Sequence, residues 1–204
     1  MDNRRDEELL AEHLAGRPGA FEVLVARYAD DLYAFFQRFV GKAGAADDLV
    51  QETFLQVHLS AGTFDPSRSF KPWLYTIAAN KGRDYMRARG RRPAQSLDQP
   101  TGGQESASLG DWLDAAGATA DDDLATRELR QRVRALMSEM PEAQRLILVL
   151  GHFHRLPYAE IAEILGIPVG TVKSRLHAAV NRFAALWLAR SPDGRAGSPP
   201  GAQE

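Results

Sequence analysis

Hydrophobic residues recur every three or four positions along most of the chain, which is the spacing of amphipathic helices. Between residues 7 and 60 the pattern falls into three segments, separated by Gly16-Arg17-Pro18-Gly19 and by the stretch from Gly41 to Gly44. The sequence therefore predicts three helices here. The middle one has an aromatic-rich face with the spacing of a core stripe: Phe21, Leu24, Val25, Tyr28, Leu32, Phe35, Phe36 and Phe39.

A loop at residues 61–69, with an Asp-Pro turn, precedes a fourth predicted helix that begins near Phe70. Residues 81–92 hold six basic side chains against one acidic side chain, Asp84. A cationic stripe beside aromatic residues is typical of single-stranded nucleic-acid binding, although the same residues also suit a solvated helix end, with Trp73 in the core. The apolar side of this helix comprises Leu74, Ile77, Ala78 and Tyr85. Its polar, cationic side comprises Thr76, Asn80, Arg83 and Arg87.

Residues 93–126 have the composition of a linker. They carry seven acidic residues and no basic one, together with several Pro, Gly and Ser residues. The helical pattern returns over residues 127–140 and continues in the apolar run from Leu146 to Leu150, which we interpret as a buried helix. The Pro- and Gly-rich stretch at residues 191–204 predicts a disordered tail.

Two amphipathic segments between Tyr158 and Phe183 are separated only by Gly166-Ile167-Pro168. So short a break predicts a helix-turn-helix, whose second helix can enter a major groove. Its expected inward residues are Val172, Leu176, Val180, Phe183 and Trp187. The opposite face is small and polar with cationic edges, as groove reading requires, but an ordinary helical hairpin with a solvated face has the same pattern. That face comprises Thr171, Ser174, Ala178 and Asn181, flanked by Arg175 and Arg182 and by Lys173 and His177.

Composition narrows the functional classes. The chain has 204 residues, of which 44% are hydrophobic and 25% are charged, as in a soluble globular protein. No apolar run reaches the roughly 20 residues that span a bilayer, and the charged N-terminus lacks the pattern of a signal peptide. The chain contains no cysteine, which excludes disulfides, thiolate metal sites and a cysteine nucleophile. We therefore expect a cytoplasmic protein without a membrane partner.

Two features invite a metal-site or enzyme interpretation. His152 and His154 lie two residues apart, and Asp121-Asp122-Asp123 form an acidic run. Neither has converging ligands in the sequence, and no nucleophile–base pair accompanies them. We therefore expect no metal, no cofactor and no enzymatic activity.

Three segments, in this order, resemble the extracytoplasmic-function (ECF) group of bacterial RNA polymerase sigma factors of the sigma-70 family. They are DDLVQETFLQV (47–57), TFDPSRSFKPWLYTIAANKGRDYMRARGRR (63–92) and LPYAEIAEILGIPVGTVKSRL (156–176). The resemblance implies an all-α protein with two small helical domains joined by a flexible acidic linker. The expected divisions are a region 2-like domain (1–92), the linker (93–126), a region 4-like helix-turn-helix domain (127–190) and the tail (191–204).

The resemblance also implies partners: core RNA polymerase, promoter DNA as duplex and as melted strand, and an anti-sigma factor. Asp48, Gln51 and Glu52 correspond to the surface that docks on the polymerase clamp helices, and residues 141–156 would meet the flap. The residues expected to capture and melt the −10 element are Phe64, Asp65, Ser67, Arg68, Ser69, Asn80, Arg83, Arg87, Arg89, Arg91 and Arg92. Those expected to read the −35 element are Thr171, Lys173, Ser174, Arg175, His177, Ala178, Asn181 and Arg182.

One departure from the family pattern concerns the second helix of the helix-turn-helix. Members of the ECF group often carry Arg where this chain has Ala178 and Val180. Since a bidentate Arg–guanine contact contributes roughly 1–3 kcal/mol of discrimination, we expect a non-standard −35 preference. The alternative function is a stand-alone helix-turn-helix regulator that binds duplex DNA as a dimer without polymerase.

Overall fold

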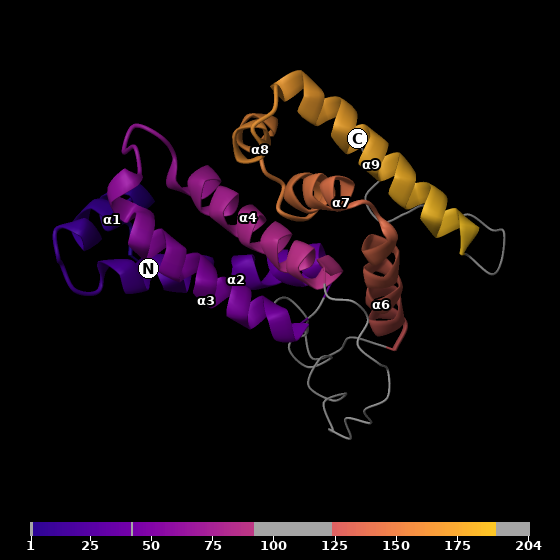
Figure 1. Cartoon of the computed structure of the whole chain (residues 1–204), viewed down its shortest axis with the longest axis horizontal. Helices are drawn as coiled ribbons and strands as arrows, with labels where there is room; N and C mark the ends of the chain where they lie inside the picture. Colours follow the sequence, from indigo (N-terminus) through magenta and orange to yellow (C-terminus); the bar gives the residue numbers. More distant parts are fainter. Residues whose placement is uncertain (1, 42, 92–123, 191–204) are drawn as a thin grey trace.

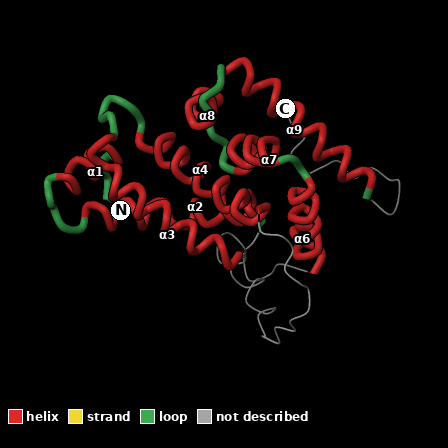
Figure 2. The backbone as a smooth tube through the Cα atoms, in the orientation of Figure 1, coloured by secondary structure: helices red, strands yellow, loops and turns green. Residues whose placement is uncertain are grey.

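The computed structural model describes residues 2–41, 43–91 and 124–190, and within these ranges every regular element is helical (Figures 1 and 2). The first group of helices comprises α1 (Asp6–Leu14), α2 (Ala20–Val40), α3 (Ala43–Ser60), the 3₁₀ helix η1 (Ala61–Thr63) and α4 (Phe70–Arg91). The second comprises α6 (Leu124–Glu139), α7 (Glu142–Leu148), the π-helical segment η2 (Val149–Phe153), α8 (Tyr158–Leu165) and α9 (Val169–Ala189). The all-α prediction is confirmed.

The boundaries differ slightly from the predicted ones. Helix α3 begins at Ala43, and α6 begins at Leu124, inside the range predicted to be linker. The rest of that linker up to residue 123, including the acidic run Asp121-Asp122-Asp123, lies outside the described residues, as does the tail. No helix in the described part of the chain has the length and apolarity needed to cross a membrane.

Helix α2 supplies the centre of the first group. Most of its predicted aromatic face is buried, and Phe35, Phe36 and Phe39 are fully inaccessible to solvent, whereas Phe21 and Val25 are only partly buried. Helix α4 approaches α2 closely at Gly82, where a Cβ atom would lie 2.7 Å from Cε1 of Phe39. Contacts of that length do not occur between packed carbon atoms, so this crossing requires glycine.

The turn between α8 and α9 confirms the helix-turn-helix. Gly166 ends α8 in the left-handed conformation, with φ of 63°, which glycine adopts without a steric penalty. The N–H of Gly166 donates to the Glu163 carbonyl (3.3 Å), and the N–H of Ile167 donates to the Ala162 carbonyl (3.0 Å). These two bonds form a Schellman motif, which reverses the chain directly after the helix. Pro168 then occupies the N-cap position of α9, and its carbonyl accepts from the N–H groups of Thr171 (2.9 Å) and Val172 (3.2 Å).

The buried face of α9 differs from the predicted one at one position. Val180 is 41% exposed, whereas Ala179 is fully buried. Steps of four residues rotate about 40° per step around a helix, so a stripe extended from Val172 through Leu176 to Val180 leaves the core. The buried stripe instead takes a step of three from Leu176 to the buried Ala179, and then continues through the half-buried Phe183 to the buried Trp187.

The two groups of helices pack against each other, which the sequence did not predict. Helix α8 packs against α4, and α7 with η2 packs against α2 (Figure 1). Tyr75 and Ala79 of α4 are fully buried although neither belongs to the predicted apolar face. Helix α4 is therefore covered on two sides, by its own group and by the second.

Candidate polymerase and nucleic-acid interfaces

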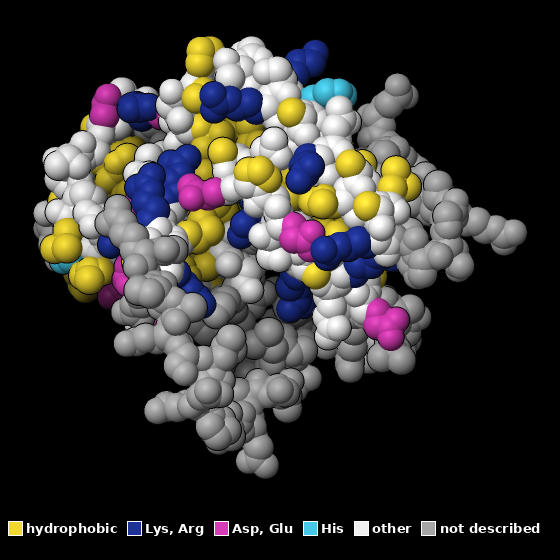
Figure 3. All heavy atoms as spheres, turned by 45° about the vertical axis from the view of Figure 1, so that its right-hand side comes forward, with side chains coloured by type: hydrophobic (Ala, Val, Ile, Leu, Met, Phe, Trp, Pro, Cys, Tyr) yellow, Lys and Arg dark blue, Asp and Glu magenta, His cyan; other side chains and the backbone are white. Residues whose placement is uncertain are grey.

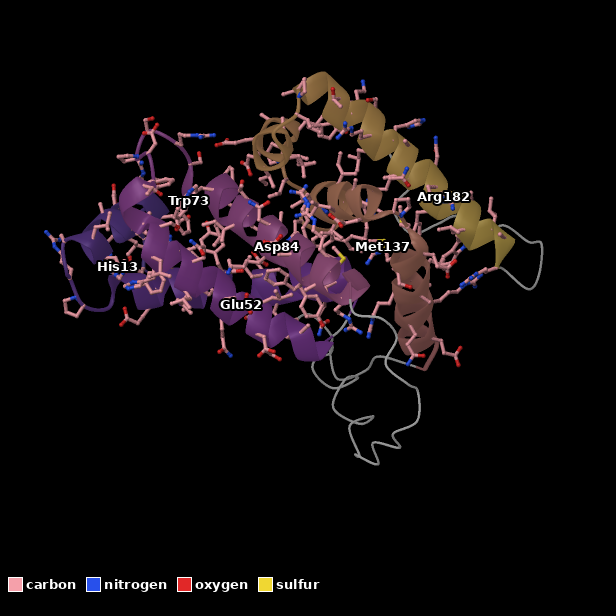
Figure 4. All side chains as sticks on the ribbon, in the orientation of Figure 1. His13, Glu52, Trp73, Asp84, Met137 and Arg182 are labelled. Carbon is pink, nitrogen blue, oxygen red and sulfur yellow. The ribbon has the colours of Figure 1, made fainter. Side chains whose placement is uncertain are left out.

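An exposed patch follows one side of α3. Asp48, Gln51 and Glu52 are exposed as predicted, because Leu49, Phe54 and Val57 occupy the buried side. The Glu52 carboxylate lies 3.6 Å from Nζ of Lys81 on α4, and Figure 4 labels Glu52 on this helix. The patch is thus oriented by the α3–α4 packing.

The same side of α3 carries two leucines that sequence reasoning did not assign to the site. Leu55 is 58% exposed and Leu59 is 70% exposed. Leu55 follows Glu52 by three residues, and Leu59 follows Leu55 by four, so both lie on the exposed side of α3. The same spacing in the sequence could have predicted their exposure. We call Asp48, Gln51, Glu52, Leu55 and Leu59 the α3 patch. Polar groups around exposed apolar side chains are typical of a surface that binds protein.

The loop before α4 is locally ordered. The Asp65 carboxylate accepts hydrogen bonds from the hydroxyl (2.7 Å) and the N–H (2.9 Å) of Ser67. These bonds hold the pKa of the Asp65 carboxyl below its usual value. The Phe64 ring packs 5.1 Å from that of Trp73 and 6.2 Å from the fully buried Phe70, measured between centroids. The loop is therefore anchored by its aromatic residues, while Ser67 and its two successors are exposed.

Only part of the predicted cationic stripe of α4 is exposed to solvent. Asn80 and Arg87 are exposed, and Arg89 donates to the Tyr85 hydroxyl (3.0 Å) while lying over its ring. Arg83 is less accessible, and its Nε lies 3.6 Å from the Glu142 carboxylate of α7. Neither the side chain of Arg91 nor any part of Arg92 is among the described residues.

Helix α9 presents its predicted face to solvent. Thr171 is half-buried, and its carbonyl accepts from the Ser174 hydroxyl (3.1 Å). Val172 and Ala179 fix the rotation of the helix from the buried side. The exposed residues are Lys173, Ser174, Arg175, His177, Ala178, Asn181 and Arg182, the last of which is labelled in Figure 4.

A shallow hollow lies beside this face, between the start of α8 and α9. It is lined by Tyr158, Lys173, His177 and Val180, among others. The exposed Val180 therefore belongs to the surface of α9 that carries the predicted reading residues, and not to the core. Figure 3 shows Lys and Arg side chains in several clusters on the face it displays, with acidic side chains beside some of them.

His154 lies between the two helix groups. Its Nδ1 is 3.2 Å from the Tyr75 hydroxyl, and its ring packs against those of Phe35 and Tyr75. Burial, and then the positive charges of Arg38 and Lys71, lower the pKa of His154 to about 4. His152 is exposed, and the described residues contain no group of three or more side chains suited to hold a metal ion.

Comparison with known protein families matches both groups of helices. The Sigma-70 region 2 family model matches residues 24–92, and the Sigma-70, region 4 model matches residues 130–183. The chain is 35% identical to the ECF RNA polymerase sigma factor SigW of Bacillus subtilis, over 79% of this chain and 86% of the relative. It is 33% identical to the ECF RNA polymerase sigma-E factor of Escherichia coli K12, over 86% of this chain and 91% of the relative.

Solved structures are similar over most of the chain. CnrH, in its complex with the cytosolic domain of CnrY, superposes with a TM-score of 0.67 at 28% identity, covering 91% of this chain and 99% of CnrH. The sigma factor RpoE from Bartonella quintana, in complex with the anti-sigma factor NepR, superposes with a TM-score of 0.59 at 24% identity, covering 84% and 98%. The second likeness concerns the fold alone.

Proposed function

The chain belongs to the ECF group of the sigma-70 family, and from this membership we propose how its surfaces divide the work of promoter recognition. It is a promoter-directing sigma factor, with core RNA polymerase and promoter DNA as its partners. One observation carries this function: region 2 and region 4 modules follow each other in order along the chain. The stand-alone regulator is not favoured, because such a protein does not need a region 2 module.

The α3 patch is the proposed docking surface for the clamp helices of the polymerase. Its acidic and amide groups would give orientation and specificity, since charged groups at the rim of an interface mainly set these properties. Leu55 and Leu59 would supply the apolar area that is lost from water on binding. Residues 141–156 are the proposed contact with the flap.

The loop before α4 and the cationic side of α4 are the proposed −10 surface. Unstacking a base costs a few kcal/mol, so a binding loop that is ordered in advance lowers the cost of capture. The hydrogen bonds from Ser67 to Asp65 and the aromatic anchor of Phe64 support this role. Asn80 would contact the captured base, and Arg87 and Arg89 would neutralise phosphates.

The exposed face of α9 is the proposed −35 reader. Ala178 is exposed there, so the absence of an arginine side chain removes a group that could have contacted base edges. Lys173, Ser174, Arg175 and His177 would then carry more of the reading. We propose a −35 preference that differs from those of relatives with arginine at this position.

The relatives are sigma factors, which are not enzymes, and we propose no catalytic role for this chain. Acting on core polymerase, it would work in the cytoplasm and require no cofactor. An anti-sigma factor is a further proposed partner. CnrH, with 28% identity, is bound to the cytosolic domain of another protein in its solved structure, which supports a protein partner here.

A binding experiment separates the sigma-factor function from the stand-alone alternative. Promoter fragments are selected from a genomic pool with core polymerase and the protein together. Their affinity for the isolated protein is then measured by fluorescence anisotropy. A sigma factor should bind them alone no better than non-specific DNA, with Kd of about 10⁻⁶ M or weaker at physiological salt. Specific binding without polymerase, with Kd near 10⁻⁸ M or tighter, would instead identify a stand-alone regulator.

A further inference from the structure

Helix α1 lies at the same end of the first group as the loop before α4 (Figure 1). It packs against η1 and α4, the two elements that this loop connects. The helix precedes the segment that the Sigma-70 region 2 model matches, which begins at residue 24. None of its residues belongs to the proposed −10 surface, so its contacts with α4 have no role in the function proposed above.

The side chain of Glu7 on α1 reaches the first residue of α4. Its Oε1 accepts a hydrogen bond from the N–H of Phe70 (3.0 Å), and its Oε2 accepts from Nη2 of Arg5 (3.2 Å). The first N–H groups of a helix have no partner within that helix, and the helix dipole favours a carboxylate beside them. Burial alone would raise the pKa of Glu7. The hydrogen bonds from Phe70, from its own N–H and from Arg5 outweigh burial and lower that pKa. Glu7 thus caps α4 from a different helix, as a charged group.

The neighbouring carboxylate of α1 holds the ring of the same phenylalanine. Asp6 accepts a hydrogen bond from the Tyr28 hydroxyl and pairs with Arg27. The buried Tyr28 ring packs 5.7 Å from the Phe70 ring, measured between centroids. The Phe70 ring lies 6.2 Å from that of Phe64, at the other end of the loop. The first turn of α1 therefore fixes both the backbone N–H and the ring of Phe70.

The exposed part of the loop lies between two fixed residues. Phe70 is one of them. Phe64 is the other, because its ring packs against Trp73 and its N–H donates to the Ala61 carbonyl (3.1 Å). Residues 65–69, between them, are all exposed. Releasing one end of so short a segment adds conformations that must be lost again on binding, which weakens binding.

We propose that Glu7 is a positioning residue for −10 recognition: its carboxylate caps α4 and holds residues 65–69 in the conformation that accepts an unstacked base. This inference rests on the proposed function for the identity of the −10 surface. Glu7 acts through Phe70 and not by touching the DNA strand. The −10 reader of this protein therefore includes a helix that lies outside the region 2 match.

The test compares variants in the first turn of α1, each assembled with core polymerase. E7A removes the cap of α4. E8A is the matched control, because it removes the same charge from the same turn. The Glu8 carboxylate, however, accepts from the N–H of Arg5 (3.1 Å), at the start of α1 itself. E7Q keeps an acceptor oxygen for the N–H of Phe70 and is the conservative variant. E7D, whose side chain is one carbon shorter, is a milder form of the same change if E7A does not fold.

The first measurement is of base capture. Each holoenzyme is titrated, by fluorescence anisotropy, with a single-stranded −10 oligonucleotide from a promoter that the parent selects, and with copies that lack one base at a time. The captured base is the one whose loss weakens binding by the parent most. E7A should reduce the ratio of intact to abasic affinity at that position about fivefold, which corresponds to the roughly 1 kcal/mol of a helix cap. E8A and E7Q should change the ratio less than twofold. A general structural defect would lower both affinities together and leave the ratio unchanged.

The second measurement is amide hydrogen exchange in the free protein. The N–H of Phe70 should exchange about fivefold faster or more in E7A, because it loses its acceptor, and at close to the parental rate in E8A. Circular dichroism checks that each variant remains folded.

Two results would overturn the inference. One is an affinity ratio that E7A and E8A change equally or not at all. The other is a Phe70 amide that exchanges in E7A at the parental rate. A parent holoenzyme that binds intact and abasic strands equally would contradict the proposed −10 surface itself, and the inference with it, so the two failures are distinguishable.

Discussion

Acidification should open the packing between the two helix groups through His154. Closure, by which we mean the packing of the two helix groups against each other, buries the imidazole beside Phe35 and Tyr75. The cationic Arg38 on α2 and Lys71 on α4 lie near it. The closed state therefore holds His154 neutral, with a pKa of about 4, against 6.5 for an unperturbed imidazole. An opened interface returns the ring to water and to its ordinary pKa.

The direction of the pH effect on closure follows from the lowered pKa of His154. Above pH 6.5 the imidazole is neutral in both states, and its contribution to closure is fully present. As pH falls from 6.5 toward 4, only the open state binds the proton, so closure loses about 1.4 kcal/mol per pH unit. At about pH 5 the accumulated loss is about 2 kcal/mol, or a roughly thirtyfold shift toward the open state.

The assay measures the distance between spin labels on cysteines that replace the exposed Leu14 of α1 and Leu188 of α9, in a chain that has no other cysteine. It is carried out at about pH 7.5, above the pH range over which His154 titrates, and at about pH 5, inside that range. The parent should broaden at the lower pH, while H154Q, which has no proton to bind, should respond much less. H13Q is the control. The pKa of His13 (labelled in Figure 4) is also lowered, by burial and by His58. This histidine lies within the first group, however, where its Nε2 is 2.9 Å from Nδ1 of His58 on α3. Equal broadening in the parent and H154Q would refute the assignment to His154.

Three substitutions test other parts of the account. G82A should lower the free energy of unfolding by about 1–2 kcal/mol in denaturant titrations. The new methyl group would overlap the buried Phe39 ring, and the cost of that overlap exceeds the gain in helix propensity from glycine to alanine. L55E should weaken binding to core polymerase about tenfold or more in a competition assay, since it places a charge in the apolar part of the α3 patch. A178R should change the −35 preference measured over a promoter library, by roughly 1–3 kcal/mol at the affected position.

Each substitution has a matched control. G44A adds a methyl group where no atom lies within 4 Å, so it should not destabilise the protein. L188E alters a leucine of the same 58% exposure on α9, and it should leave polymerase affinity unchanged. A185R places arginine at an exposed position further along α9. It should leave unaltered the base preference at the −35 position that A178R changes. Equal effects in a variant and its control would contradict the corresponding role.

Periodicity alone predicted the helices and the helix-turn-helix because each depends on residues close together in sequence. The exposed polar side of α3 and most of the exposed face of α9 follow from the same local information. The prediction that Val180 faces inward was wrong, because two successive steps of four, from Val172 to Leu176 and on to Val180, rotate away from the buried side of α9. Gly82 could not be assigned, since its role depends on the distance between α4 and a side chain of α2.

The packing between the modules was not predictable in this way. Periodicity shows that a side chain is apolar and on a given face, but not which distant element covers it. Tyr75 and Ala79 of α4 are buried, in addition to the predicted apolar face. Arg68 and Glu163 are far apart in sequence, and nothing in the sequence indicates which of the many acidic residues pairs with Arg68. The sequence predicted two modules that bind separate promoter elements and are joined by a flexible linker, whereas the structure places the two modules in contact.

The central claim is that this chain opens promoter DNA only together with core polymerase. Permanganate footprinting on promoter fragments selected by the holoenzyme tests it most directly, because permanganate modifies unpaired thymines. With core polymerase and the protein together, reactive thymines should appear in the −10 region, and transcripts should start a short distance downstream. With either component alone, the duplex should remain closed. Specific duplex binding by the protein without polymerase, and no unpaired thymines when both are present, would contradict the account.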